Sequence, residues 1–497
     1  MRFISTRQRG EGISAAEAII KGISWDGGLF VPEIFPELTL DEIKTLSAQP
    51  YEKTAAVVTG KYLTDFTDRE LIEIAVEAYK GFDTVERAPL IKLRHGEYVL
   101  ELWHGPTLAF KDMALQMLPH LLCASMKKTG YTGRVLILTA TSGDTGKAAL
   151  EGFAGVKGTA ICVFYPKDGV SAAQKLQMCT QEGDNVFVCG VEGNFDDTQT
   201  GVKEIFADEA FNRYAMEKGF VLSSANSINF GRLVPQIAYY VWAYSCMASR
   251  GAVAWGQKVN FIVPTGNFGN ILAAYYAKRM GLPVHKLICA SNANNVLTEF
   301  FREGRYDCKR AFCRTISPSM DILISSNLER LVFELTGRDT EKVKSMMKEL
   351  NDKGKYAVGE NIRAILADSF WADWVDDAKT KETISKAFKK SGYLMDPHTA
   401  VGQAVYERYL DATGDATPSV AVSTASPYKF SPDVLEALCG AKNNNLSESQ
   451  ASRKLSKLSG TNIPDAIANL EKKPVLYRNW CTTCGMKAEV EKFIGRL

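Results

Sequence analysis

The segment RVLILTATSGDTGKAAL, residues 134–150, contains the pattern that decides the fold. It begins with a continuous apolar run, continues through a loop of small residues at Thr141 to Gly146, and predicts a helix from Lys147. A run that is apolar throughout is typical of a strand that is buried on both faces, as in a parallel sheet. The segment therefore predicts one strand, loop and helix of a βαβ unit.

The same pattern recurs further along the chain. The run Ile161 to Phe164 precedes a helix predicted near Ser171, and VNFIVPT, residues 259–265, precedes a helix predicted from Ile271. Parallel strands need crossover helices that cover both faces of the sheet. We therefore expect an α/β protein with parallel sheets.

The first 95 residues differ from the rest. Helical stretches are expected at Ser14 to Lys21 and at Thr39 to Ser47, without a comparable buried strand, so we expect a separate N-terminal domain. The polar stretch from Asn443 to Lys454 is expected to be an exposed loop.

Composition excludes several classes of protein. The 497 residues include 59 Lys and Arg against 57 Asp and Glu, a net charge of +2, and 46% are hydrophobic, which excludes a disordered or fibrous chain. A nearly neutral chain has no long-range field to attract nucleic acid or an anionic membrane, so neither partner is expected. The most apolar stretch, Ile237 to Met247, is too short to cross a bilayer.

The cysteines indicate a reducing compartment. There are 11, an odd number, and the N-terminus lacks the apolar core of a signal peptide, so we expect a cytoplasmic protein. Cys481 and Cys484 have the spacing of half a zinc ribbon, but no second pair or nearby histidine completes four ligands. Free thiols and no metal site are expected.

In open parallel sheets, ligands bind beyond the carboxyl ends of the strands, so the residues after each apolar run are candidates for a site. Lys111 follows the run Tyr98 to Trp103 and lies near a predicted helix start, with Phe110 before it. The positive end of the helix dipole and apolar surroundings favour the neutral amine, which can form a Schiff base. The alternative is that Asp112 balances the charge while Lys111 points to water.

Two glycine-containing loops are candidates for binding anions. In Thr141 to Gly146, small residues before a helix let backbone N–H groups converge on a carboxylate or phosphate, although Asp144 and Thr145 are also ideal N-cap residues. The spacing is two residues too short for a nucleotide-binding P-loop. The second loop, GNFGN at 266–270, can bind a phosphate without a lysine, or can be an ordinary turn.

Six motifs, taken in their order along the chain, resemble those of the threonine synthase family. They are STR with DGGLFVPE (5–7 and 26–33), HGPTLAFKD (104–112), TSGDTG (141–146), SANSINFGR (224–232), GNFGN (266–270) and DPHTAVG (396–402). The resemblance covers nearly the whole chain. It implies a fold type II pyridoxal phosphate enzyme, with the cofactor between two parallel-sheet α/β domains, plus an N-terminal α-rich domain. We expect the domains to be residues 1–95, residues 96–130 with 226–497, and residues 131–225.

The resemblance also implies a reaction and a cofactor site. The enzyme would be a carbon–oxygen lyase that converts O-phospho-L-homoserine and water to L-threonine and phosphate. Lys111 would be the catalytic residue and would hold pyridoxal phosphate as a Schiff base. The cofactor would also contact Asp144, near its phenolic oxygen, and Thr424, opposite the pyridine nitrogen. Its phosphate would be bound by Gly266, Asn267, Phe268 and Asn270.

Substrate contacts are assigned in the same way. The loop residues Ser142, Gly143 and Thr145 would hold the substrate α-carboxylate, whereas Asn226, Arg232 and Lys429 are candidates for its phosphate. An arginine just inside a helix is also commonly a surface ion pair. His398 is a nearby histidine, but a lone histidine in a packed loop is more often structural.

Alternative functions stay open from the sequence. One is a threonine dehydratase-like lyase of the same fold, and the other is a cofactor-binding paralogue without activity. We expect a monomer or a weak homodimer.

Overall fold

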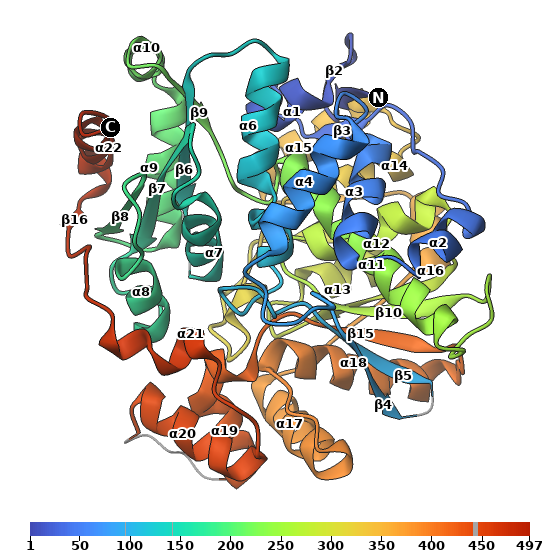
Figure 1. The fold of residues 1–497 in the computed structure, drawn as a ribbon. Coiled ribbons are helices and arrows are strands. Elements are labelled where there is room, and N and C mark those ends of the chain that lie inside the picture. Colours follow the sequence, from blue (N-terminus) through green and yellow to red (C-terminus); the bar gives the residue numbers. More distant parts are fainter. Residues whose placement is uncertain (95, 142, 441–445) are drawn as a thin grey trace.

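The computed structural model describes residues 1–497 except 95, 142 and 441–445, and it omits the side chain of residue 196. Two parallel sheets lie side by side, each with helices on both faces (Figure 1). This architecture confirms the expected α/β class with parallel sheets.

The larger sheet has six strands in the order β14-β11-β10-β15-β5-β4, all parallel except for β4. The bounds are β4 Leu90–Arg94, β5 Glu97–Glu101, β10 Val259–Pro264, β11 Val284–Ser291, β14 Phe370–Trp374 and β15 Ser419–Ser423. Alternate residues of β10 face opposite sides, because Phe261 and Val263 join one apolar cluster and Ile262 joins another. Burial of both faces explains why this strand is a continuous apolar run.

Helices cover both faces of the larger sheet. Helix α11 (Phe230–Ser249) packs against α12 (Gly269–Met280) on one face, and α18 (Pro397–Thr413) lies against the other. The remaining helices of this region are α5 Asp112–Leu115, α6 Leu118–Lys128, α13 Val296–Glu303, α14 Leu328–Leu335, α15 Thr340–Lys353, α16 Glu360–Ser369, α17 Asp377–Ser391, α19 Ser431–Cys439, α20 Glu448–Ser459 and α21 Asp465–Ala468. Within the described part of the chain, no helix is both long and apolar enough to cross a membrane.

The smaller sheet has five parallel strands in the order β16-β8-β7-β6-β9. The strands are β6 Arg134–Ala140, β7 Thr159–Pro166, β8 Val186–Val191, β9 Phe220–Ser223 and β16 Trp480–Cys481. Its helices are α7 Asp144–Phe153, α8 Ala172–Cys179, α9 Phe195–Ala207, α10 Glu209–Glu217 and α22 Met486–Ile494. The strands and helices predicted around residues 134–150 and 161–171 are confirmed.

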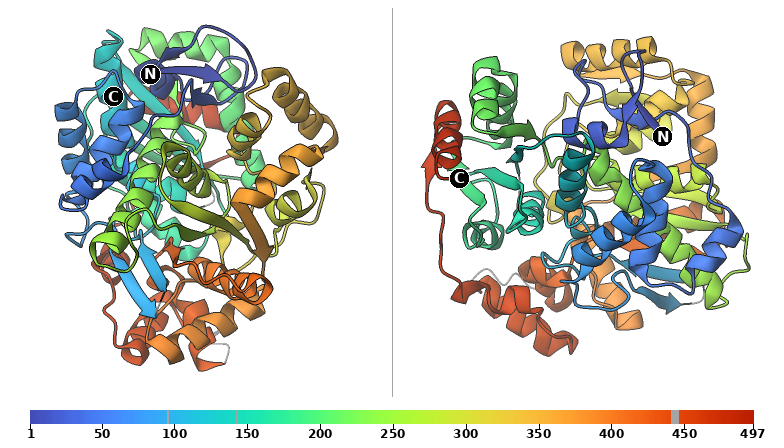
Figure 2. Two further views of the ribbon diagram at one scale, coloured as in Figure 1. Left: turned by 90° about the vertical axis from the view of Figure 1, so that its right-hand side faces the viewer. Right: turned by 45° about the horizontal axis from the view of Figure 1, so that its top comes forward.

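The end of the chain differs from the expected domain boundary. The expectation places residues 226–497 with the larger sheet, but the C-terminal segment crosses to the smaller one (Figures 1 and 2). Strand β16 pairs with β8, and α22 contributes Met486, Val490 and Phe493 to the smaller sheet's apolar cluster. The packing of these side chains places the last residues with the smaller sheet.

The N-terminal region has three short strands and four helices. The strands form an antiparallel sheet, β1 Arg2–Ser5, β2 Ile13–Ser14 and β3 Phe30–Pro32, and the helices are α1 Ala15–Lys21, α2 Leu40–Leu46, α3 Tyr51–Tyr62 and α4 Asp68–Tyr79. Three of the helices begin with a capping box, in which a Ser or Thr and a Glu three residues later bond each other's backbone N–H groups. The two helices predicted here are confirmed, whereas the short sheet was not predicted.

The expected loop at Asn443 to Lys454 is partly wrong, whereas the expected free cysteines are confirmed. The polar stretch from Asn443 to Lys454 was expected to be a loop, but α20 begins at Glu448; residues 443–445 lie outside the described residues. All 11 cysteines are free, as expected, although Cys189 and Cys481 approach within 3.7 Å at their sulfur atoms. No cluster of potential metal ligands occurs among the described residues.

Candidate active site

Lys111 lies inside the protein, at the N-cap of α5. Its side chain is 10% exposed, and Nζ lies 3.2 Å from Ser319 Oγ and 3.8 Å from Asp144 Oδ2. Burial lowers the pKa of this amine; Asp144 opposes the shift, while the positive charges of Lys429 and Arg232 add to it, so the pKa falls to about 8. The alternative in which Lys111 points to water is therefore wrong.

Asp112 folds the segment that carries Lys111, and its negative charge also opposes part of the lowering of the Lys111 pKa. Its carboxylate accepts hydrogen bonds from the Thr107 backbone N–H at 2.8 Å and the Thr107 hydroxyl at 2.7 Å. Gly105 is required here, because a Cβ at this position would lie 2.5 Å from the Asp112 Cβ. Burial raises the pKa of Asp112 to about 6 despite these hydrogen bonds.

His104 anchors the start of the same segment. Its Nδ1 lies 2.6 Å from Asp83 Oδ1 and its Nε2 lies 2.8 Å from Glu101 Oε2. Burial lowers the pKa of the imidazole, but the hydrogen bonds to Asp83 and Glu101 outweigh burial and raise the pKa to about 9. The imidazolium therefore joins the end of β5 to the segment between α4 and β4, which contains Asp83.

This arrangement predicts a pH dependence of stability. The folded-state pKa of His104 lies above its unfolded value, so its contribution is fully present below about pH 6.5 and is lost as the pH rises through about 9. The wild-type protein should lose up to about 3 kcal/mol of unfolding free energy over that range relative to His104→Gln. Urea unfolding at several pH values measures this difference. An identical pH profile for wild type and His104→Gln would contradict the prediction.

Asp144 begins α7 and faces two lysines. It lies 2.9 Å from Lys429 Nζ and accepts a hydrogen bond from Gln174 Nε2 at 3.1 Å. Although burial raises its pKa, the charges of Lys429 and Lys111 lower it well below the usual range, so the carboxylate is ionised. The N-cap residue of α7 is Gly143, which has no capping side chain, so Asp144 is not a cap.

The rest of this loop is held together internally. Thr141 Oγ1 accepts hydrogen bonds from the N–H groups of Gly143 at 3.0 Å and Gly146 at 2.8 Å. Gly143 has a φ of 142°, and Gln174 fills the space where a Cβ would stand. Thr145 lies one residue into α7, whereas Ser142 lies outside the described residues.

The loop after β10 leads into α12 and contains a buried, unpaired donor. Phe268 has a φ of 66°, in the left-handed region, and α12 begins at the next residue. Asn270 Oδ1 accepts hydrogen bonds from the hydroxyls of Tyr239 at 2.5 Å and Tyr240 at 2.6 Å. Its Nδ2 is buried and finds no acceptor in the described part of the chain. Buried donors are nearly always satisfied, so this one indicates a ligand.

The end of β15 is joined to the Lys111 segment. The Phe110 N–H donates to the Thr424 carbonyl at 2.8 Å, which places Thr424 beside Lys111 in the fold. Lys429, on the turn that follows, donates to the Thr107 carbonyl at 2.9 Å in addition to pairing with Asp144. Lys429 is therefore engaged within the site.

Arg232 is a buried cation that has no carboxylate partner among the residues that the structure describes. It lies in the first turn of α11 and is 6% exposed, and among the described residues its guanidinium makes one hydrogen bond, from Nη1 to the Ala225 carbonyl at 2.8 Å. Burial lowers its pKa to about 10. The surface ion pair considered for this residue is wrong. Asn226, beside Ala225, is partly exposed.

Sequence reasoning missed Ser319 and Gln174, which both contact Asp144. Neither follows one of the apolar runs that were searched for strand-end residues. His398, considered and set aside, contacts the backbone of Ser319 at 3.1 Å.

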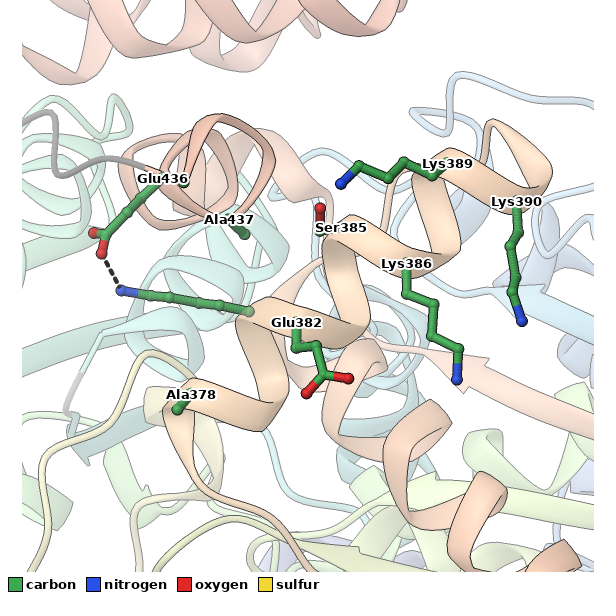
Figure 3. Close-up of a pocket in the computed structure, with 10 residues that line it drawn as sticks. Ala378, Glu382, Ser385, Lys386, Lys389, Lys390, Glu436 and Ala437 are labelled. Atoms are coloured by element: carbon green, nitrogen blue, oxygen red, sulfur yellow. Dashed lines mark ion pairs between the residues drawn. The ribbon is translucent and has the colours of Figure 1, made fainter.

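A surface depression of about 710 Å³ lies between α17 and α19, away from Lys111 (Figure 3). Lys381 and Glu436 form an ion pair of 2.9 Å across it, and Lys389 and Lys390 extend from α17. Charged side chains on an exposed helix are ordinarily solvated, so this depression is no candidate for the site.

Three family comparisons match along the chain. Residues 82–368 match the family described as pyridoxal-phosphate dependent enzyme, residues 2–79 match threonine synthase N terminus, and residues 399–483 match threonine synthase, C-terminal. Together they cover the N-terminal region, the smaller sheet and every strand of the larger sheet except β14.

Individual relatives agree. The chain is 41% identical to threonine synthase of Pseudomonas aeruginosa, over 88% of this chain and 90% of the relative. It is 39% identical to human threonine synthase-like 1 over 90% of this chain, but it spans only 62% of that relative's length. The crystal structures of threonine synthase from yeast and of the pyridoxal phosphate-bound enzyme from Brucella melitensis superpose with TM-scores of 0.88 and 0.87. Their sequence identities are 33% and 35%; each covers 100% of this chain, and the chain covers 99% of each.

Proposed function

The chain belongs to the threonine synthase family of pyridoxal-phosphate-dependent enzymes, and we propose that it converts O-phospho-L-homoserine and water to L-threonine and phosphate. One observation carries this proposal: a buried lysine with a lowered pKa shares its site with a second buried cation, Arg232, that has no carboxylate partner among the described residues. The amine suits covalent binding of the cofactor, and the free guanidinium suits an anionic substrate.

The residues present fit pyridoxal phosphate. The unpaired Nδ2 of Asn270 and the N-terminus of α12 offer donors for its phosphate. With Gly266, Asn267 and Phe268, they would hold that group without a charged side chain. When bound, the cofactor supplies an electron sink that stabilises negative charge on substrate carbons next to the amine.

Lys111 would act twice. Its Nζ would hold the cofactor at its carbonyl carbon, and once the substrate amine had taken that place, the freed amine would remove one proton from substrate Cα and one from Cβ. Phosphate would then leave from Cγ, and Cγ would gain a proton. Water would add its hydroxyl to Cβ while a proton returns to Cα, which balances substrate and water against threonine and phosphate. A pKa of about 8 leaves a substantial neutral fraction near physiological pH, which both roles require.

The other site residues would bind and orient. Asp144, held by Lys429, would lie near the cofactor's phenolic oxygen, and the uncharged hydroxyl of Thr424 would face the pyridine nitrogen without forcing its protonation. Ser142, Gly143 and Thr145 would receive the substrate α-carboxylate. Arg232, with Asn226, would receive the substrate phosphate; Lys429 is the weaker candidate because it already pairs with Asp144.

The first test is the absorbance spectrum of the purified protein, followed by assays of phosphate and threonine after addition of O-phosphohomoserine. We expect a band near ~410–430 nm from the lysine-bound cofactor and the release of both products. A band without phosphate release, but with ammonia released from threonine, would move the function to a dehydratase-like lyase. A band with neither product would indicate a non-catalytic paralogue.

The remaining proposals concern the cell and the assembly. The odd number of cysteines supports a reducing compartment, and we place the protein in the cytoplasm as a monomer or weak homodimer that binds neither nucleic acid nor membrane. Sedimentation at several protein concentrations measures the assembly.

A further inference from the structure

A short 3₁₀ turn, Pro318–Met320, places a hydroxyl directly on Lys111. Lys111 Nζ donates to Ser319 Oγ at 3.2 Å, and Ser319 Oγ donates to Asp144 Oδ2 at 3.3 Å. Because Asp144 is ionised, it can only accept, so the single hydrogen of the Ser319 hydroxyl is directed to it. Ser319 Oγ is then left to accept from Lys111.

The direction of these two hydrogen bonds has a consequence for the amine. A neutral amine has two hydrogens and one lone pair, and the hydrogen bond to Ser319 uses one of the hydrogens. The lone pair therefore points away from Ser319 and stays free to attack a carbonyl or to take a proton from carbon. A hydroxyl that could turn and donate to Nζ would occupy that lone pair instead.

The turn that carries Ser319 is fixed from its own loop. Asp321 closes the loop with hydrogen bonds from the Thr315 N–H at 2.9 Å and the Thr315 hydroxyl at 2.7 Å. The amides of Asn292 and Asn294 donate to the same carboxylate at 2.7 Å and 3.0 Å. Four hydrogen bonds to one carboxylate hold the turn in place.

A buried histidine fixes the turn from the other side. His398 Nε2 accepts a hydrogen bond from the Ser319 N–H at 3.1 Å, so its proton lies on Nδ1, which is 2.8 Å from Asp396 Oδ1. Both side chains are almost completely buried, at 2% and 0% exposed. Gly266 allows the close approach, because a Cβ there would lie 2.6 Å from the Ser319 carbonyl oxygen.

We propose that Ser319 is a further catalytic residue of the reaction proposed above, which orients Lys111 Nζ by accepting its hydrogen bond, and that His398 and Asp396 are positioning residues that hold Ser319. The inference rests on the proposed function for its substrate but not for its contact with Lys111. In this proposal His398 holds Ser319 in position and does not itself transfer a proton.

The test compares Ser319→Ala with Ser319→Thr, which keeps the hydroxyl, and with Ser317→Ala. Ser317 is a matched control, because it is buried in the same loop and bonds to Asn292 rather than Lys111. In Ser319→Ala, kcat for O-phosphohomoserine should fall by about 10–100-fold, with KM within about threefold of wild type. Ser319→Thr should recover most of this loss, and Ser317→Ala should keep kcat within about threefold.

A second measurement does not depend on turnover. After the cofactor has been removed, the rate at which the ~410–430 nm band returns on adding pyridoxal phosphate reports the attack of Lys111 Nζ. This rate should fall by about tenfold in Ser319→Ala and stay near wild type in Ser317→Ala. If wild type releases no phosphate from O-phosphohomoserine, the proposed function fails while this rate still tests Ser319.

His398→Gln tests the positioning role. Alone it should reproduce part of the loss in the rate of band return, and combined with Ser319→Ala it should add nothing further, because both act through one hydroxyl. Independent, multiplying losses would overturn the role of His398. The role of Ser319 is overturned if Ser319→Ala leaves that rate unchanged, or if Ser317→Ala slows it as much.

Discussion

Replacing Lys111 by alanine should abolish both the ~410–430 nm band and the formation of threonine. The variant lacks the amine that binds the cofactor and the base that moves protons at substrate Cα and Cβ, so kcat should fall by a factor on the order of 10⁴ or more. The absorbance spectrum and the rate of phosphate release measure the two losses separately. Non-covalent cofactor binding can persist, because Asn270 and the N-terminus of α12 are unchanged.

Two further variants test whether the amine of Lys111, rather than its positive charge, is required. Lys111→Arg keeps a cation, but a guanidinium does not lose its proton, so this variant should fail like the alanine variant. Lys147→Met removes another buried lysine, which pairs with Glu151 at 2.6 Å, and should keep the band and most of the activity. A band in Lys111→Ala, or a loss of less than about tenfold in kcat, would contradict the assignment of Lys111.

The strands of both sheets could be predicted because they are buried on both faces. The runs at 134–140 and 259–264 have apolar residues on both faces of the strand. Each strand can therefore be recognised from the sequence without knowing which strands pair with it. The helix predicted from Ile271 is α12, which begins at Gly269 and ends with Gly281 as its C-cap in the left-handed conformation. Signals of this kind are local, so they predict strands and helix ends without any knowledge of the tertiary structure.

The C-terminal end of the chain could not be predicted in the same way. Strand β16 is only two residues long, and its pairing with β8 joins residues about 290 positions apart, so no periodicity marks it. Helix α20 did have a signal that polar composition obscured, because Ser447 and Gln450 form a capping box. Its apolar contacts come from few residues, among them Leu455.

Some residues of the candidate site could be predicted from local sequence, and others could not. Lys111, Asp144 and the 266–270 loop follow strands, so strand-end reasoning and the family motifs both find them. The environment of Lys111 depends on segments far away, since Ser319 is 208 residues and Asp144 is 33 residues further along the chain. Packing buries Lys111, which lowers its pKa, and leaves Arg232 without a carboxylate partner among the described residues; no local sequence pattern reports either property.

Arg232 and Arg330 provide a matched comparison of a free and a satisfied buried arginine. Burial lowers the pKa of both guanidinium groups to about 10. Arg330 donates to the Phe30 and Ile228 carbonyls at 3.0 Å and 2.6 Å, and to the Asn327 side chain, so it is satisfied within the fold. The Arg232 guanidinium makes one hydrogen bond in the described part of the chain, so its other N–H donors are left for a ligand.

Arg232→Met should therefore raise KM for O-phosphohomoserine by about 10–100-fold, because a charge-assisted hydrogen bond to phosphate contributes about 1.5–3 kcal/mol. Cofactor affinity should change by less than about threefold. Arg232→Lys keeps the charge but loses the fork of donors, so an intermediate increase is expected. Steady-state kinetics and cofactor titration measure these quantities.

The control variant, Arg330→Lys, should change stability rather than KM. Arg330→Lys removes hydrogen bonds that tie α14 to the Phe30 and Ile228 carbonyls, so the midpoint of unfolding should fall while KM stays within about threefold of wild type. An unchanged KM in both Arg232 variants would remove Arg232 from the substrate site. A large loss of cofactor affinity in Arg232→Met, with KM unchanged once the cofactor is saturating, would reassign its guanidinium to the cofactor phosphate. In either case the substrate phosphate would have to be bound by other donors near Lys111, with Asn226 the first to examine.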